Sequence, residues 1–253
     1  MPVRLTRSGR TATLTLDRPP LNILDIPMLE ELATQLEGLR QDPSLHILIL
    51  EGAGTRAFSA GVAIEDHVPE KLQAMLETFH RALRTLRELP AISLAVVQGH
   101  CLGGGMELAT CCDLLLASED AGFGLPEVEL GCFPPAAAAL YPRRLGVGRS
   151  LDLLLTGRRL GGREAHELGL ATWIAASEDL QERRRTLLAN LNTRSAAVAR
   201  LIKEAVRQGE QLPFDEALRA NEDIYLEKLA STADMQEGLD AFEQRRPAEW
   251  KHR

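Results

Sequence analysis

Residues 99–107 read Gly99-His100-Cys101-Leu102-Gly103-Gly104-Gly105-Met106-Glu107 and join an apolar run at residues 92–97 to a predicted helix that includes residues 106–109. Glycine lets a backbone approach a ligand closely and adopt positive φ angles. A helix N-terminus also presents unpaired N–H groups and the positive end of the helix dipole. A triple glycine also fits tight packing of a helix on a strand, so this segment alone leaves ligand binding and packing both open.

A second segment is built in the same way. Residues 57–62, AFSAGV, come after an apolar run at residues 46–50. Two backbone N–H groups from separate turns that converge on one point would form an oxyanion hole, which stabilises negative charge on a substrate oxygen. Neither segment contains GxxxxGK[ST] or GxGxxG, so phosphate cradling of those kinds is not predicted. The absence of GxSxG argues against Ser59 as a hydrolase nucleophile.

The flanking sequence alternates apolar runs with amphipathic segments. Predicted strands occupy residues 3–16 (a strand or a hairpin), 46–50, 92–97 and 113–117, and predicted helices occupy residues 26–39 and 69–89. Beyond residue 146 the chain is predicted to be mainly helical, over residues 150–155, 162–168, 180–191, 196–208 and 213–229. This order predicts an α/β core with crossover connections, followed by a helical region that packs on a neighbouring subunit.

The composition narrows the class of protein. Of the 253 residues, 45% are hydrophobic and 26% are charged, which is typical of a globular chain. The net charge of −7 and the lack of a basic stripe argue against nucleic acid as a partner. No apolar stretch approaches the ~20 residues that span a bilayer, and no signal peptide is recognised. The four cysteines lack zinc-site spacing, so we predict no metal and a reducing cytoplasm.

Two glutamates stand where the predicted strands give way to the next segment. Glu107 lies just inside the helix after the triple glycine, and Glu127 follows Pro126. Paired carboxylates in a cleft of low dielectric repel one another, so one of them is expected to hold its proton near neutral pH. An acid beside an ionised base is what the addition of water to a double bond requires. Both glutamates also fit the simpler role of acids favoured at a helix N-terminus.

Taken together, these segments resemble the crotonase (enoyl-CoA hydratase/isomerase) superfamily over nearly the whole chain. Further matching stretches are LTLDRP at residues 14–19, LTGR at 155–158, EAHELGL at 164–170, GLDAF at 238–242 and Arg246-Pro247. The resemblance implies a spiral of repeated ββα units, here residues 1–195, and a C-terminal helical trimerisation region, here residues 196–253. It also implies an acyl-CoA substrate and a homotrimer or a dimer of trimers, with no cofactor, because coenzyme A is part of the substrate.

The resemblance also assigns roles to particular residues. It implies that the backbone N–H groups of Val62 and Gly104 form the oxyanion hole. It implies that Glu107 and Glu127 hold and activate water and return a proton to the α-carbon of the substrate. Residues expected to contact the acyl group are Ala60, Ala63, Phe133 and Pro135. Residues expected to bind coenzyme A are Arg18 and Arg245, although an exposed C-terminal salt bridge is an open alternative for Arg245.

Two departures from the family pattern narrow the range of acyl groups expected in the substrate. Hydratases of straight-chain substrates carry an aspartate after the first oxyanion residue, where this chain has Ala63. Pro135 stands where relatives have a glycine whose N–H helps to hold water, and proline has no N–H. Residues 58–67 and the turn at residues 133–135 resemble the cyclohexa-1,5-diene-1-carbonyl-CoA hydratases. His67, in the first of these segments, could reach the cleft or could hydrogen-bond at the start of the next helix.

Three functions therefore remain in view. The first is hydration of an α,β-unsaturated acyl-CoA, with a cyclic dienoyl group preferred. The second is an ordinary enoyl-CoA hydratase or an enoyl-CoA isomerase. The third is a non-catalytic acyl-CoA-binding protein that keeps the fold, against which the retention of both Glu107 and Glu127 argues.

Overall fold

The computed structural model describes residues 2–253, so residue 1 of the predicted first domain lies outside the described residues. The contacts divide the chain into two compact units. The core unit runs up to Leu89 and continues from Ser93 to Arg184. The C-terminal unit comprises Pro90–Ile92 and Arg185–Arg253. The predicted domain boundary after residue 195 stays a prediction.

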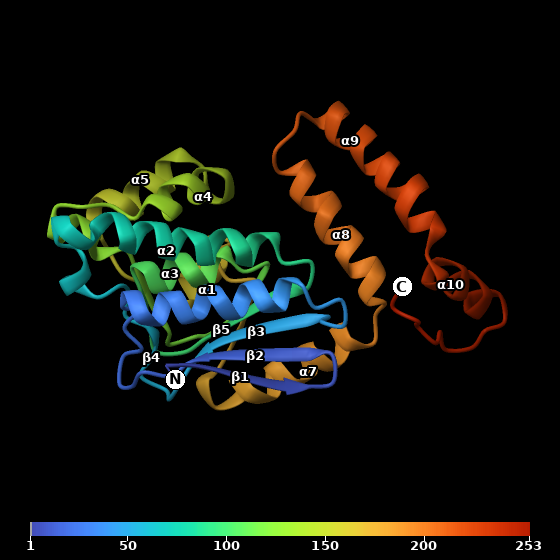
Figure 1. Cartoon of the computed structure of the whole chain (residues 1–253), viewed down its shortest axis with the longest axis horizontal. Helices are drawn as coiled ribbons and strands as arrows, with labels where there is room; N and C mark the ends of the chain where they lie inside the picture. Colours follow the sequence, from blue (N-terminus) through green and yellow to red (C-terminus); the bar gives the residue numbers. More distant parts are fainter. Residues whose placement is uncertain (1) are drawn as a thin grey trace. The chain divides into compact units, whose positions relative to one another are not determined.

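A six-stranded sheet forms the larger β layer (Figure 1). Its order is β1 (Val3–Ser8), β2 (Thr11–Leu16), β3 (Ile47–Gly52), β5 (Ile92–Val97), β7 (Leu114–Ser118) and β10 (Trp173–Ala175). The first two strands are an antiparallel hairpin, whereas β2 pairs with β3, and β7 with both β5 and β10, in parallel. Strands β3 and β7 are almost wholly buried, which explains why they read in the sequence as continuous apolar runs.

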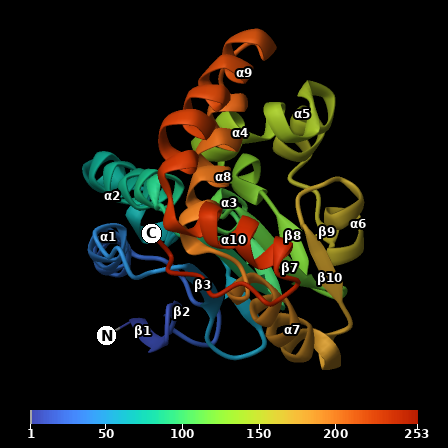
Figure 2. The same cartoon turned by 90° about the vertical axis from the view of Figure 1, so that its right-hand side faces the viewer.

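A smaller sheet of four short strands carries the segments that the sequence analysis singled out. Its order is β4 (Ala57–Ser59), β6 (His100–Leu102), β8 (Gly122–Gly124) and β9 (Leu160–Gly161). Strands β8 and β9, which pair antiparallel, lie side by side in Figure 2. Strands β4 and β6 lie within the two glycine-containing segments, at residues where the sequence analysis predicts no strand. Three-residue strands are too short to show an alternating pattern.

The two sheets are built by repetition along the chain. The pairs β3–β4, β5–β6 and β7–β8 each place their first strand in the large sheet and their second in the small one. Each pair leads into helical structure: η1 (Ile64–Asp66) and α2 (Pro69–Glu88), then α3 (Gly104–Cys111), then η2 (Pro126–Leu130) and α4 (Pro135–Leu145). This repeated ββα arrangement confirms the predicted fold class.

Helices of the core unit follow the predicted apolar faces. Helix α1 (Ile26–Arg40), predicted over residues 26–39, buries apolar residues that recur at helical spacing: Met28, Leu29, Leu32, Leu36 and Leu39. Asp25 caps its N-terminus, since its carboxylate accepts a 3.1 Å hydrogen bond from the backbone N–H of Met28. Helices α1 and α2 pack side by side (Figure 1). The core unit also contains α5 (Val147–Thr156), α6 (Gly162–Glu167) and η3 (Ser177–Asp179).

Helices make up nearly all of the C-terminal unit. Helix α7 (Leu180–Asn192) enters it, followed by α8 (Ala196–Gly209), α9 (Phe214–Asp223), the π-turn η4 (Ile224–Lys228), the 3₁₀-turn η5 (Leu229–Ser231) and α10 (Ala233–Glu243). Helices α8 and α9 form an antiparallel pair (Figure 1). The helix predicted over residues 213–229 is therefore regular only as far as Asp223.

Candidate active site

In the loop after β4, one backbone N–H group takes no part in the hydrogen bonds to the neighbouring chain segment. Leu24 and Val62 form an isolated parallel bridge, in which Leu24 N donates to Gly61 O at 2.9 Å and Ala63 N donates to Leu24 O at 3.0 Å. The bridge therefore uses the carbonyl of Gly61 and the N–H of Ala63, the residues on either side of Val62. The N–H of Val62 itself is therefore left available to a ligand.

The second loop presents a helix N-terminus. Gly103 has φ +51° and ψ −129°, which an L-residue with a side chain rarely adopts, and Gly104 is the first residue of α3. The first α-helical hydrogen bond here runs from Glu107 N to Gly103 O at 3.0 Å. The N–H of Gly104 precedes that bond and has no acceptor within the helix.

These two loops touch one another. A Cβ atom placed on Gly104 would lie 2.7 Å from Cγ2 of Val62, and one placed on Gly61 would lie 3.6 Å from the backbone N of Gly104. A Cβ on Gly105 would lie 2.6 Å from the carbonyl oxygen of Ser59. The triple glycine thus serves close packing at Gly105 and close approach of the two loops at Gly104. The packing interpretation is confirmed, and ligand binding by this segment stays a prediction.

Glu107 lies in a protected environment. It is 4% exposed, and its Oε1 accepts a 2.8 Å hydrogen bond from the backbone N–H of Ala137, in the first turn of α4. Burial raises the pKa of Glu107 to about 7. The hydrogen bond from Ala137 opposes this rise, and the negative charge of Glu127 adds to it. The repulsion expected from the sequence is therefore present, but desolvation is the larger cause.

Glu127 is carried by η2 and is half-buried. Its Oε1 lies 2.8 Å from the place where a Cβ on Gly103 would stand. Its Oε2 is buried and has no hydrogen-bond partner among residues 2–253. Burial raises the pKa of Glu127, whereas a hydrogen bond from its own backbone N–H and the charge of His67 lower it. An unpaired buried carboxylate oxygen is costly, so its position suits a group that approaches a ligand or water.

One cavity of about 470 Å³ brings the predicted site residues together. Those that line it are Ala60, Val62, Gly104, Glu107, Glu127, Phe133 and Pro135. The wall also includes apolar side chains that the sequence analysis did not name, at Ile64, Leu72, Met75, Leu76, Phe79 and Leu130. Four of these lie on α2, and their spacing on one face of an amphipathic helix is the signal that could have identified them.

Three of the predicted contact residues do not line the cavity. Ala63 is buried, and its carbonyl accepts hydrogen bonds from the backbone N–H of Asp66 and from the ring of His67. Arg18 forms an ion pair with Asp25. Arg245, in the C-terminal unit, has φ +51° and no ion-pair partner among residues 2–253, whereas Arg246 pairs with Glu237. The acyl and coenzyme A contacts predicted for Ala63, Arg18 and Arg245 stay predictions.

His67 lines the cavity, and its hydrogen bond is made within the η1 turn that precedes α2 and not to α2 itself. Its Nδ1 lies 2.9 Å from the carbonyl oxygen of Ala63, just before α2, and its ring also lines the cavity. Pro135, which also lines the cavity, begins α4, where the missing N–H costs no helical bond. The N–H of Ala137, two residues later, is the one that reaches Glu107.

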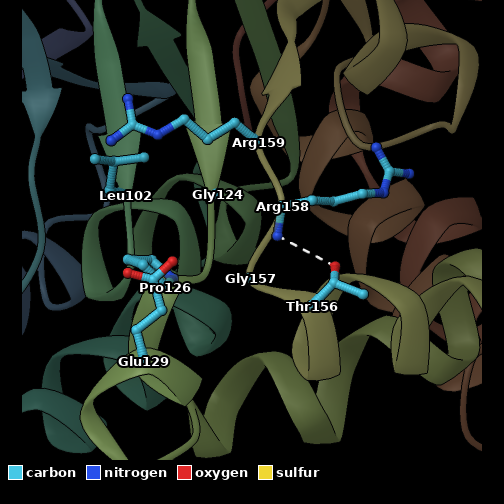
Figure 3. Close-up of a pocket in the computed structure, with 8 residues that line it drawn as sticks. All are labelled: Leu102, Gly124, Pro126, Glu129, Thr156, Gly157, Arg158 and Arg159. Carbon is cyan, nitrogen blue, oxygen red and sulfur yellow. Dashed lines mark hydrogen bonds between the residues drawn. The ribbon is translucent and has the colours of Figure 1, made fainter.

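A second cavity of about 280 Å³ lies behind η2 (Figure 3). Pro126 lines both cavities, Glu127 lines the larger one and Glu129 the smaller one. Arg158, whose N–H donates to Thr156 Oγ1 at 3.2 Å (dashed line in Figure 3), forms ion pairs with Asp152 and Glu164. The family stretches at residues 155–158 and 164–170 are thus joined by an ion pair beside the turn that carries Glu127.

Neither a metal cluster nor a membrane span is found within the described part of the chain. No group of three or more His, Cys, Asp or Glu side chains in residues 2–253 could hold a metal ion. No helix of that part is long and apolar enough to cross a membrane. The four cysteines are free thiols.

The repeated ββα fold and the paired glutamates beside a glycine-rich helix start define a class of protein, and the family comparison agrees. The model of the enoyl-CoA hydratase/isomerase family matches residues 6–253. The chain therefore belongs to the enoyl-CoA hydratase/isomerase family, which confirms both the resemblance and the enzyme class predicted from the sequence.

Particular relatives cover the chain from end to end. The cyclohexa-1,5-dienecarbonyl-CoA hydratase of Thauera aromatica is 36% identical over 251 residues, which cover 99% of this chain and 96% of that protein. The carnitinyl-CoA dehydratase of Proteus mirabilis is 31% identical over 259 residues, with 99% and 98% covered. The crystal structure of an enoyl-CoA hydratase from Bacillus anthracis matches with a TM-score of 0.94 at 29% identity, covering 100% of both chains.

Proposed function

We propose that this protein adds water to an α,β-unsaturated acyl-CoA thioester through an enolate that is stabilised by an oxyanion hole. The observation that carries the proposal is the shared cavity, which is lined by both Glu107 and Glu127 and by the two glycine-containing loops. Either acid alone would fit several reactions. Two acids beside a pair of available backbone N–H groups fit the addition of water.

In this mechanism the thioester oxygen accepts hydrogen bonds from the N–H groups of Val62 and Gly104. When the hydroxyl group adds to the unsaturated carbon, negative charge moves onto that oxygen as the enolate forms. Backbone donors that are already in place stabilise this charge without reorganising. The loss of one such donor in other enzymes costs about 2.7–4 kcal/mol of activation free energy.

The acid pair accounts for the protons. Water loses one proton to the ionised carboxylate as its oxygen bonds to carbon, and the protonated carboxyl delivers one to the α-carbon when the enolate collapses. The pair keeps one proton in total, and transfer of this proton back between the two carboxyls restores the starting state. One carboxyl must hold a proton while the other is ionised. The raised pKa of Glu107, about 7, supports such a division near neutral pH. Because Pro135 offers no N–H, the water depends on the two carboxylates.

For the acyl group we propose a cyclic dienoyl substrate, cyclohexa-1,5-diene-1-carbonyl-CoA. This is supported by the 36% identity to the Thauera aromatica protein of that name. It is also supported by Ala63 in place of an aspartate and by the apolar wall that includes Phe133. Coenzyme A would be part of the substrate, with its phosphates near Arg18 and Arg245, and we propose no separate cofactor.

A substrate panel tests this proposal. Crotonyl-CoA, a 3-enoyl-CoA and the cyclic dienoyl-CoA would be compared by kcat/KM, and we expect the cyclic thioester to be preferred. A preference for crotonyl-CoA would indicate a general hydratase, and turnover of the 3-enoyl thioester would indicate an isomerase. Thioester binding without turnover of any of the three would overturn the catalytic proposal in favour of a binding protein.

Substitution of one acid tests the mechanism. Glu127→Gln should reduce hydration by orders of magnitude while thioester affinity is retained, because the amide cannot exchange the proton. Glu129→Gln is the matched control, since Glu129 lies on the same turn but lines the smaller cavity. Turnover of Glu127→Gln at the wild-type rate would exclude the proposed role of this acid.

We also propose that the chain forms a homotrimer or a dimer of trimers through its C-terminal unit. Helices α9 and α10 and the turn between them expose large apolar side chains, with Phe214 78%, Leu226 70% and Phe242 85% exposed. Apolar surface of this kind is typical of a protein–protein interface. Neither nucleic acid nor a membrane is a proposed partner, and the four free thiols suit the proposed cytoplasmic location.

A further inference from the structure

The turn before α2 is held firmly at a buried aspartate. Asp66 is 5% exposed, and its Oδ2 accepts a 2.9 Å hydrogen bond from the backbone N–H of Ile26. Its Oδ1 accepts a 2.9 Å bond from Nζ of Lys71. These bonds join η1 to the starts of α1 and α2. The next residue, His67, therefore projects from an anchored backbone.

The ring of His67 is oriented by a hydrogen bond to the main chain. A carbonyl oxygen can only accept, so Nδ1, 2.9 Å from Ala63 O, carries the proton and donates it. In the neutral ring this assigns the other nitrogen, Nε2, as an acceptor; in the charged ring both nitrogens are donors. Nε2 has no hydrogen-bond partner among residues 2–253 and lies on the edge of the ring away from Ala63.

Glu127 lies within the electrostatic reach of this ring. Both residues line the same cavity, and the positive charge of His67 lowers the pKa of Glu127 against the effect of burial. The Oε2 atom of Glu127 is buried without a partner. No interaction with His67 lowers the pKa of Glu107, which burial raises to about 7. The cavity is therefore asymmetric, because His67 acts on Glu127 but not on Glu107.

We propose that His67 is a positioning residue that holds the negative charge on Glu127 and so leaves the proton of the acid pair on Glu107. This inference rests on the proposed hydratase function, because it concerns the same two acids. It assigns His67 neither a bond to substrate nor a proton transfer of its own. It also explains how the pair is divided in a site where Pro135 removes one hydrogen-bond donor.

Other charged groups surround His67 and must be considered with it. The titratable groups around the ring are Asp66 on η1, Lys71 on α2, Glu127 on η2, Glu107 on α3 and the thiol of Cys132. Asp66 and Lys71 pair with one another and so largely neutralise each other. Among these groups, Glu127 is the one that combines an unpaired oxygen with an interaction with His67.

The direct test is a titration that does not depend on activity. Glutamate carboxyl carbons would be labelled with carbon-13, and the resonances of Glu107 and Glu127 would be assigned from Glu107→Gln and Glu127→Gln. In His67→Asn, the side-chain amide can still donate to Ala63 O but carries no charge. We expect the pKa of Glu127 to rise by about half a unit or more in this variant, because a nearby cation is removed.

His166 provides a matched control. Its Nδ1 also lies 2.9 Å from a main-chain oxygen, that of Ala171, and it does not line the cavity. His166→Asn should leave the carboxyl titrations of both glutamates unchanged. If His67→Asn also leaves the titration of Glu127 unchanged, the inference is overturned, whether or not the wild-type protein is a hydratase.

Kinetics separate a positioning role from a structural one. His67→Asn should keep the wild-type melting temperature and thioester KM, lower kcat, and move the acidic limb of the kcat profile to higher pH. A merely structural role predicts an unchanged profile, and that result would overturn the inference. If the wild-type protein hydrates no thioester, the proposed function fails, and the carboxyl titration still decides the effect of His67 on Glu127.

Discussion

Oε1 of Glu107 accepts a 2.8 Å hydrogen bond from the backbone N–H of Ala137, which ties the buried acid of α3 to the first turn of α4. The bond satisfies one carboxylate oxygen, and the backbone N–H of Ala136 also interacts with the carboxylate. It lowers the pKa of Glu107, but burial outweighs it and the pKa reaches about 7. Ionising the carboxyl in this buried position therefore costs folding stability.

The first prediction concerns stability against pH. The pKa of Glu107 is raised in the folded state, from 4.5 to about 7. The protonated form therefore contributes stability that is present below about pH 4.5 and lost as the pH rises through 7. Glu107→Gln keeps an acceptor for Ala137 and avoids this loss. Its stability relative to wild type should increase by about 3 kcal/mol between pH 4.5 and pH 8, as measured by urea unfolding.

The control for this experiment is Glu129→Gln, which makes the same substitution at an exposed acid. We expect Glu107→Gln to lose hydratase activity at every pH while it gains stability at high pH. A stability difference between wild type and Glu107→Gln that does not vary with pH would contradict the buried-acid interpretation.

A second prediction tests the contact between the two loops. Gly104→Ala places a methyl group 2.7 Å from Cγ2 of Val62 and 3.3 Å from Cζ of Phe79, in the space proposed for the thioester oxygen. We expect kcat/KM to fall about 100-fold, as when an oxyanion-hole donor is lost. Val62→Ala removes Cγ2, so the double variant should recover part of the loss. Strictly additive effects in the double-mutant cycle would contradict a direct contact.

The third prediction separates backbone strain from displacement of Glu127. Gly103→Ala introduces a Cβ at φ +51° and 2.8 Å from Oε1 of Glu127. It should lower stability by roughly 1–3 kcal/mol and reduce kcat sharply, because the carboxylate must move. Gly146 also has positive φ, at +80°, but a Cβ there meets no atom within 4 Å. Gly146→Ala should therefore lower stability without lowering kcat; equal kcat values for the two variants would contradict the proposed displacement.

The fourth prediction concerns assembly. Phe242 is 85% exposed on α10, and in the proposed trimer it would be covered by another subunit. Phe242→Ser should reduce the molecular mass measured by light scattering to that of smaller species at low protein concentration. Glu243→Ser, at the next position of the same helix, is the control and should retain the wild-type mass. A monomeric wild-type protein would exclude the trimer directly.

Much of the fold could be predicted from the sequence because its signals are local. The helix at residues 26–39 and the β structure at residues 3–16 follow from periodicity, and the structure confirms both; of the two forms left open for residues 3–16, it shows the hairpin. The strands β4 and β6 could not be predicted in this way, since three residues carry no period. The end of the regular helix at Asp223 also has no breaker residue to mark it.

The candidate site was only partly accessible from the sequence. The sequence points to Glu107, Glu127 and Gly104, because each lies in a segment that follows a predicted strand. The residues of α2 that line the cavity, such as Met75 and Phe79, looked like ordinary core residues, since one apolar face can serve either purpose. The position of Ala63 behind the wall also follows from tertiary contacts, as it depends on the bridge formed by Leu24.

The sequence by itself determined the longer strands and most of the helices, the two glycine-containing loops and the identity of the paired acids, because these depend on neighbouring residues and recognisable motifs. Tertiary structure alone decided that Val62 meets Gly104, that His67 faces the same cavity as Glu127, and that Glu107 is buried deeply enough for its pKa to reach about 7. Burial and charge interactions act through space between residues far apart in the chain, so no local pattern records them.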